Sequence, residues 1–183
     1  MPRLARKTLP GGRVHINAVG VRRTPIYRVS LDARAFLRYA DVAFERFDVR
    51  CDAYCLMPDH FHFLLDGTRD ALSRALHHVN FRYARWFNDR YELEGHVFGD
   101  RFYERVIRDD EHYFEVMRYV VLNPVKDGLC RHPREWRWSS YRAAAGIGPR
   151  APFLSLDWQS EMSAASFRAH VEEGIGVALP DPF

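Results

Sequence analysis

The chain has 183 residues, of which 47% are hydrophobic and 14% aromatic, with three cysteines and a formal net charge of +3. The hydrophobic fraction is enough to bury a core and argues against a disordered chain, and the odd count of three cysteines argues against a dense disulfide scaffold and fits a reducing compartment. Because no apolar run approaches the roughly 20 residues that span a bilayer, and no apolar stretch follows the basic N-terminus, we expect a cytoplasmic protein with no membrane partner and no signal peptide.

Strands and helices alternate along the predicted chain. A β-rich segment over 13–21 predicts a first strand, and apolar side chains at helical spacing predict a helix over 31–47. Strands over 49–57 and 60–65 then flank a tight turn. The remaining predicted elements are a long helix over 70–88, a strand over 102–107, a helix that Pro124 ends at about Asn123, and a short helix over 136–145.

The resulting order, β-α-β-β-α-β-α, predicts an α+β fold. We expect a ferredoxin-like antiparallel sheet with helices on one face, followed by a further C-terminal helix. Two glycines and two prolines over 146–152 indicate a linker. We therefore assign residues 1–146 to the main domain and residues 147–183 to a linker and a polar C-terminal appendage.

Positive charge is concentrated near the N-terminus. No Asp or Glu precedes Asp32, whereas seven basic residues do: Arg3, Arg6, Lys7, Arg13, Arg22, Arg23 and Arg28. This asymmetry fits a polyanionic partner, and it fits a solvated basic arm equally well.

The segment Met57-Pro58-Asp59-His60-Phe61-His62 contains the first candidate site. Residues i and i+2 of a strand point to the same face, so His60 and His62 project together. Two neighbouring imidazoles suit a shared divalent metal ion. Two unrelated strand histidines would give the same pattern.

A second candidate site lies in the predicted helix before Pro124. Tyr119 and Asn123 are i and i+4 and share one helix face, while Met117 and Val121 lie on a stripe that can pack on the sheet. A surface tyrosine followed by an ordinary helix stop is the alternative interpretation.

Four motifs in this order resemble the single-tyrosine HUH transposases, specifically the REP-associated branch related to small bacterial insertion sequences. They are Met-Pro-Asp at 57–59, His-Phe-His at 60–62, Arg-Tyr-Val-Val-Leu-Asn-Pro-Val at 118–125 and Trp-Ser-Ser-Tyr at 138–141. The resemblance covers about residues 14–145. At His15 the first strand departs from the family's commoner pattern, because no Thr and Arg-Gly pair follows it.

The resemblance implies a metal-dependent transposase that cleaves and rejoins hairpin-flanked single-stranded DNA through a 5′-phosphotyrosine bond. Tyr119, on a catalytic C-terminal helix, would be the nucleophile. His60 and His62 would bind Mg²⁺ or Mn²⁺, and Asn123 would add an oxygen ligand. The active protein would be a monomer or a homodimer.

Five arginines are candidate contacts for the DNA backbone. They are Arg22, Arg23, Arg28, Arg82 and Arg85.

Two other interpretations stay open. One is a non-catalytic nucleic-acid-binding regulator derived from a transposase. The other is a structural zinc site that uses Cys51, Cys55, His60 and His62, with both cysteines on one face of their strand. If Tyr119 is not the nucleophile, Tyr113 is the next candidate.

Overall fold

The computed structural model describes residues 12–99, 102–177 and 182–183, so Arg3, Arg6 and Lys7 lie outside the described residues. Its framework consists of β1 (Gly12–Val19), α1 (Ser30–Phe47), β2 (Arg50–Leu56), β3 (His60–Gly67), α2 (Arg69–Tyr91), β4 (Tyr103–Val106) and α3 (Asp110–Lys126). Shorter elements are η1 (Val21–Arg23), η2 (Pro133–Glu135), α4 (Tyr141–Ala144), η3 (Asp157–Ser160) and α5 (Ala164–Glu172). None of the described helices has both the length and the apolar character that crossing a membrane requires.

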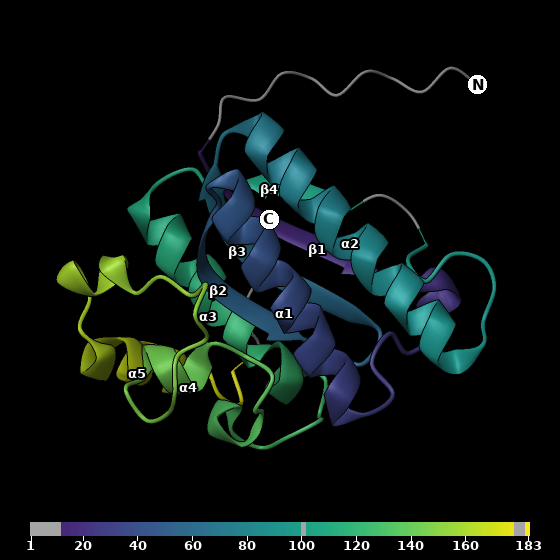
Figure 1. Ribbon diagram of the computed structural model, residues 1–183. Helices are drawn as coiled ribbons and strands as arrows, with labels where there is room; N and C mark the ends of the chain where they lie inside the picture. Colours follow the sequence, from purple (N-terminus) through teal and green to yellow (C-terminus); the bar gives the residue numbers. More distant parts are fainter. Residues whose placement is uncertain (1–11, 100–101, 178–181) are drawn as a thin grey trace.

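The strands form an antiparallel sheet in the order β2-β3-β1-β4 (Figure 1). Strands β1 and β3 lie in the centre and pair along their whole length, from Gly12 opposite Gly67 to Val19 opposite His60. This order of a β-α-β-β-α-β chain is ferredoxin-like, which confirms the fold predicted from the sequence. Side chains on β1 and β3 are therefore held by neighbouring strands on both sides.

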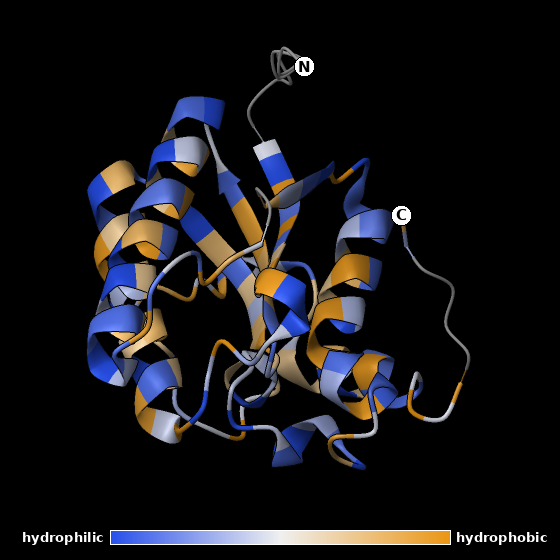
Figure 2. Ribbon diagram, turned by 90° about the vertical axis from the view of Figure 1, so that its right-hand side faces the viewer, coloured by the Kyte–Doolittle hydropathy of each residue, from blue (hydrophilic) through white to orange (hydrophobic). Residues whose placement is uncertain are grey.

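The two faces of the sheet carry different side chains. On β1 and β3, residues such as Ile16 and Phe63 are buried against α1 and α2, as the period of two requires. The intervening residues His15, His62 and Leu64 point to the opposite face, which α3 covers. Figure 2 shows the sheet between these two helical layers. Helices α1 and α2 thus share one face, as predicted, and α3 is the further C-terminal helix.

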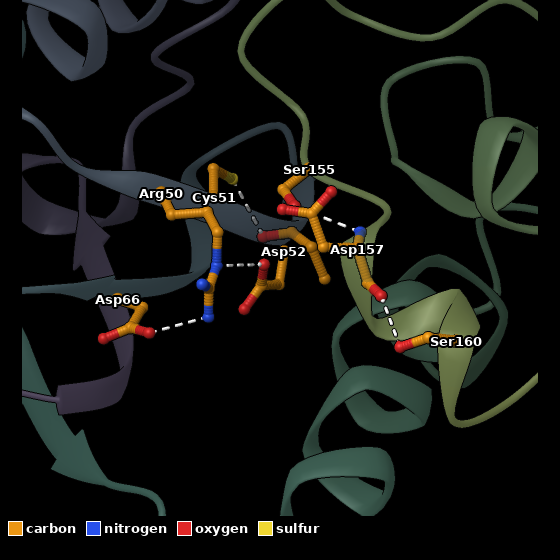
Figure 3. Close-up of polar contacts among 8 residues, drawn as sticks. Arg50, Cys51, Asp52, Asp66, Ser155, Asp157 and Ser160 are labelled. Atoms are coloured by element: carbon orange, nitrogen blue, oxygen red, sulfur yellow. Dashed lines mark hydrogen bonds and ion pairs between the residues drawn. The ribbon is translucent and has the colours of Figure 1, made fainter.

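Strand β2 contains a β-bulge, and its two cysteine side chains lie on opposite faces of the sheet. Its register to β3 shifts between Cys51 and Ala53, where Arg50 contacts Asp52 (3.1 Å) and Asp66 (2.6 Å) (Figure 3). Because a bulge interrupts the alternation of side chains, Cys51 packs in the core under α1 and α2, while Cys55 packs in the core under α3. The expectation that the two cysteines share a face was wrong for this reason.

Helix α3 continues past the predicted stop. It begins at Asp110, capped by the Asp109 side chain, and includes Pro124 before ending at Lys126. A proline inside a helix leaves the carbonyl four residues earlier without its N–H donor. That carbonyl belongs to Val120, and Nδ2 of Asn123 lies 3.5 Å from it and donates to the Tyr119 carbonyl at 2.8 Å. The Asn123 side chain thus lies at the limit of hydrogen-bond distance from the carbonyl that Pro124 leaves without a backbone donor, and the helix continues to Lys126.

The described part of the C-terminal segment packs onto the sheet and α3. The Ser155 amide donates to the Cys51 carbonyl at 2.7 Å, and Trp158, Phe167 and Val171 are buried beside α3. The predicted boundary at residue 146 stays a prediction, but this segment contributes apolar side chains to the core. Of the short helix expected over 136–145, only Tyr141–Ala144 is helical.

Candidate active site

The two histidines of the His-Phe-His motif lie side by side on the face of the sheet that α3 covers. Their ring centroids are 4.9 Å apart, with the rings nearly perpendicular. His62 is buried, whereas the His60 side chain is 13% exposed. Burial, reinforced by the neighbouring His15, His60 and Lys126, lowers the pKa of His62 well below its ordinary value. His62 is therefore a neutral imidazole, the form that binds metal ions.

Each of these histidines has a partner that fixes its ring. Oδ1 of Asp59 lies 2.6 Å from Nδ1 of His60, and Nε2 of His15 lies 2.9 Å from Nδ1 of His62. With Nδ1 of each ring engaged, Nε2 is the nitrogen that remains on each ring for another ligand. Nε2 of His62 is buried and has no hydrogen-bond partner among the described residues, which suits a nitrogen that binds a metal ion.

The roles of Asp59 and His15 were not predicted from the sequence. A carboxylate directly before a candidate metal-binding histidine was a usable signal, because such histidines commonly pair with a carboxylate. No local signal identified His15, because its contact with His62 depends on the register between β1 and β3. The same register places Asn17 opposite His62, and Oδ1 of Asn17 is buried without a hydrogen-bond partner among the described residues.

Tyr119 reaches this cluster from α3. Its half-buried ring meets His62 edge-on at 5.8 Å and His15 at 5.9 Å between centroids. Asn123 lies one helical turn later on the same side, and its amide nitrogen is turned back to the helix carbonyls. The Nζ atom of Lys126 lies 5.2 Å from the Tyr119 ring centroid. The structure thus brings together all four residues that the motifs singled out.

Tyr113 does not lie in a comparable position. Its ring is fully buried, and burial together with the neighbouring Asp52 raises the pKa of its phenol far above the ordinary value. A buried, firmly protonated phenol is a poor nucleophile. Tyr113 is therefore not a second candidate on structural grounds.

A basic cleft of about 510 Å³ opens beside Tyr119. Arg22, Arg23 and Arg105 line it together with His15 and Tyr119. Both η1 arginines adopt left-handed backbone angles, with φ of 51° and 55°, which non-glycine residues rarely do. Such strained turns cluster at functional sites, and this one directs positive charge toward the tyrosine.

The five arginines predicted to contact DNA do not lie together. Arg22 and Arg23 line the cleft beside Tyr119. Arg28 stacks over the Tyr91 ring at 4.3 Å, and Arg82 and Arg85 lie on α2, away from His60 and His62. Arg105, which was not predicted, joins the cleft from β4.

Phe183 also lies in this region and was not predicted. Its ring stacks on that of His15 at 4.8 Å and lies 6.3 Å from the Tyr119 ring. Phe183 therefore covers one face of His15 and forms part of the cleft wall.

The structure does not support the alternative zinc site. Cys51 and Cys55 lie on opposite faces of the sheet, and burial raises the pKa of each thiol well above its ordinary value. The described residues contain no group of three or more His, Cys, Asp or Glu side chains placed to hold a metal. A zinc site that combines both thiols with the two histidines is thus excluded by geometry, because the thiols lie on opposite faces of the sheet.

Comparison with known proteins identifies the class to which this fold, with its histidine pair facing a helical tyrosine, belongs. Residues 10–122 match the family described as "Transposase IS200 like". The chain therefore belongs to the IS200-like transposase family.

Individual relatives fall in one branch of that family. A protein of Haemophilus influenzae named as a REP-associated tyrosine transposase is 29% identical over 126 residues, which are 62% of this chain and 69% of that protein. The REP-associated tyrosine transposase of Escherichia coli is 26% identical over 135 residues, 69% of this chain and 73% of the relative. The fold also matches a solved REP-associated tyrosine transposase bound to a REP hairpin, with a TM-score of 0.63, 22% identity, and coverage of 81% of this chain and 89% of that one.

Proposed function

We propose that this protein cleaves and rejoins single-stranded DNA beside a hairpin, with Tyr119 as the nucleophile. One observation carries the proposal: the half-buried Tyr119 ring meets the His15–His62 pair at the edge of a cleft lined by arginines. A solved neighbour of the same fold is bound to a REP hairpin, so hairpin DNA is the substrate we infer for this chain.

The proposed reaction conserves the phosphodiester bond energy. The Tyr119 oxygen attacks the phosphorus and loses its proton, and the bond from phosphorus to the 3′-oxygen breaks. The products are a 5′-phosphotyrosine and a free 3′-hydroxyl. A second 3′-hydroxyl then attacks the phosphotyrosine, forms a new phosphodiester and releases the phenol. Strands are thus exchanged without ATP, as transposition requires.

His60 and His62 are the residues we propose to hold Mg²⁺ or Mn²⁺, with the Asn123 oxygen as a further ligand. The unpartnered, buried Nε2 of His62 supports this assignment. When bound, such an ion polarises a non-bridging phosphate oxygen. Two imidazole ligands favour Mn²⁺ over Mg²⁺, since Mg²⁺ prefers oxygen. The partners Asp59 and His15 orient the two rings.

The cleft arginines have a separate role in the proposal. Arg22, Arg23 and Arg105 would neutralise phosphates of the strand that enters the cleft. Their guanidinium groups bind phosphate oxygens as forked donors and so position the scissile bond near Tyr119. Whether the active protein is a monomer or a homodimer stays a prediction.

A covalent-adduct assay tests the proposal and separates it from the non-catalytic alternative. The protein is incubated with Mn²⁺ and a hairpin oligonucleotide labelled 3′ of the cleavage site, and SDS-stable adducts are resolved on a gel. We expect an adduct with the native protein and with Tyr113→Phe, and none with Tyr119→Phe, which should still bind the hairpin. An adduct of unchanged yield from Tyr119→Phe would refute the proposal, and hairpin binding without any adduct from the native protein would favour a regulator.

A further inference from the structure

A second basic groove lies on the outer side of the molecule, between α1 and α2. It has a volume of about 610 Å³. Both helices pack on the Phe63 face of the sheet, whereas the histidines and Tyr119 lie on the other face. Figure 1 shows α1 and α2 side by side in front of the sheet, with α3 behind it. The groove is therefore separate from the candidate active site.

Arginines line this groove from both helices. Arg34 and Arg38 are one turn apart on α1, and Arg82 and Arg90 are two turns apart on α2. One helical turn separates side chains by about 6 Å, a spacing similar to that of successive phosphates on one strand. No acidic residue occurs among the described residues that line the groove. The groove thus presents a concentrated positive charge.

Most of the groove arginines are not neutralised by an acidic side chain of the described residues. Arg34, Arg38 and Arg82 are exposed and form no ion pair with any described residue. Arg90 differs, because its Nε lies 3.5 Å from the buried Asp32 carboxylate. The pKa of His78, also in the groove wall, is lowered by burial and by the nearby Arg46 and Arg82. The local field therefore favours an anion.

Two half-buried aromatic rings lie between the arginines. Tyr39 and Trp86 line the groove, and Trp86 packs against Tyr83 at 5.8 Å between centroids. The Arg90 guanidinium lies 5.7 Å from the Trp86 centroid. A basic groove with embedded aromatic rings is the arrangement that binds single strands, because phosphates meet the arginines and bases stack on the rings.

We infer that the groove between α1 and α2 binds a segment of single-stranded DNA other than the strand held at Tyr119. The inference deepens the proposed function and rests on it for the choice of DNA as the polyanion. The groove would hold a flanking or incoming strand on the far side of the sheet. Cleavage of the hairpin would then not require the groove. Stable binding of a longer single strand would require it.

The test uses two triple variants of the full chain in the Tyr119→Phe background, which prevents covalent capture. The groove variant is Arg34→Ser, Arg38→Ser and Arg82→Ser. The matched control removes the same charge from exposed arginines outside the groove that also form no ion pair with described residues: Arg131→Ser, Arg150→Ser and Arg168→Ser. Thermal melting checks that both variants fold.

The probe is an oligothymidine strand that contains 5-iododeoxyuridine, titrated at several salt concentrations and then photo-crosslinked. We expect crosslinks at Tyr39 or Trp86 that the groove variant loses and the control keeps. We also expect binding at low salt to weaken at least tenfold in the groove variant. The slope of log affinity against log salt should fall by about 2 relative to the control, at roughly 0.7 per lost phosphate contact.

Equal affinities and salt slopes in the two triple variants would overturn the inference, as would crosslinks confined to peptides around Tyr119. A groove that binds polyglutamate as tightly as the DNA strand would also overturn it, in favour of an acidic protein partner. The proposed function is tested apart from this. Restoring Tyr119 in the groove variant should leave the hairpin adduct intact, and absence of adduct from the native protein would refute the cleavage reaction without changing the crosslinking result.

Discussion

His15 and His62 form a buried, stacked pair, with Nε2 of His15 2.9 Å from Nδ1 of His62 and their ring planes 18° apart. If His62 donates its Nδ1 proton to His15, Nε2 of His62 carries the lone pair that a metal ion needs. His15 therefore acts in our proposal as a positioning residue, which selects the tautomer and orientation of a metal ligand from a neighbouring strand.

Replacing His15 should weaken metal binding without removing a ligand. We expect His15→Ala to reduce Mn²⁺ affinity by about 10- to 100-fold, the usual effect of losing a partner of a metal-binding histidine. Adduct formation should then recover at high Mn²⁺, whereas His62→Ala should not recover. Calorimetric titration of Mn²⁺ measures the affinity, and His77→Ala, an exposed histidine on α2, is the control. Unchanged Mn²⁺ affinity in His15→Ala would contradict the positioning role.

Asn123 combines a structural role with a proposed ligand role, and Pro124 allows the two to be separated. Asn123→Ala removes the amide that covers the Tyr119 and Val120 carbonyls, so we expect a loss of about 1 kcal/mol in unfolding free energy. In the double variant Asn123→Ala, Pro124→Ala, the new N–H can bond to the Val120 carbonyl and restore stability.

In these two variants, the Mn²⁺ concentration needed for adduct formation should not follow the free energy of unfolding. If the Asn123 oxygen binds the ion, both variants need more Mn²⁺ for adduct formation, and restoring the helix does not help. Urea unfolding and Mn²⁺ titration of the adduct measure the two effects. Recovery of normal Mn²⁺ dependence in the double variant would show that Asn123 acts only on the helix.

Local patterns predicted the parts of the fold that depend on local chemistry. The alternation on β3 correctly placed His60 and His62 on one face, and the i, i+4 relation placed Tyr119 and Asn123 on one side of α3. Features that depend on pairing between distant segments could not be predicted from the sequence. His15 meets His62 through the β1–β3 register, which no local signal fixes.

Two predictions were wrong because of the local structure around one or two residues. The bulge after Cys51 changes the faces of the β2 cysteines, although the sequence there alternates normally. The helix stop expected at Pro124 was wrong, and the neighbouring Asn123 side chain lies 3.5 Å from the carbonyl that the proline leaves without a donor. In both cases the local structure departs from a sequence rule, strand alternation or the helix stop at proline, that holds for most proteins.

Arg50 should contribute a pH-dependent share of the stability. The Asp52 carboxylate is buried, which raises its pKa above the ordinary value, and the adjacent Arg50 opposes that rise. Arg50→Met removes the opposing charge, so the pKa of folded Asp52 rises further. A group whose folded pKa is raised destabilises the fold above that pKa, and the cost disappears as the pH falls through it.

We therefore expect Arg50→Met to cost about 1–3 kcal/mol at pH 7, since Arg50 is 40% exposed and solvent screens part of the pair. The loss should be smaller at pH 5 than at pH 7, because the pKa of Asp52 is raised and the cost of its charge falls as the pH approaches that pKa. Urea unfolding at the two pH values measures it. Arg74→Met, which removes an ion pair between two exposed side chains, should cost less than about 1 kcal/mol at both. A loss for Arg50→Met that is independent of pH would contradict the role assigned to Asp52.

Gly20 determines the turn that carries Arg22 and Arg23 into the cleft. A Cβ atom there would lie 2.4 Å from the Thr24 carbonyl oxygen, and the Gly20 amide donates to the Asp59 carbonyl at 2.7 Å. Gly20→Ala must therefore displace backbone, and we expect a loss of about 1–3 kcal/mol with weaker hairpin binding. Gly67→Ala is the matched control, because its Cβ would meet only ordinary contacts at 3.6 Å or more. Urea unfolding and hairpin titration distinguish the outcomes: if Gly20→Ala keeps native affinity for the hairpin while losing stability, the turn does not position the arginines for DNA.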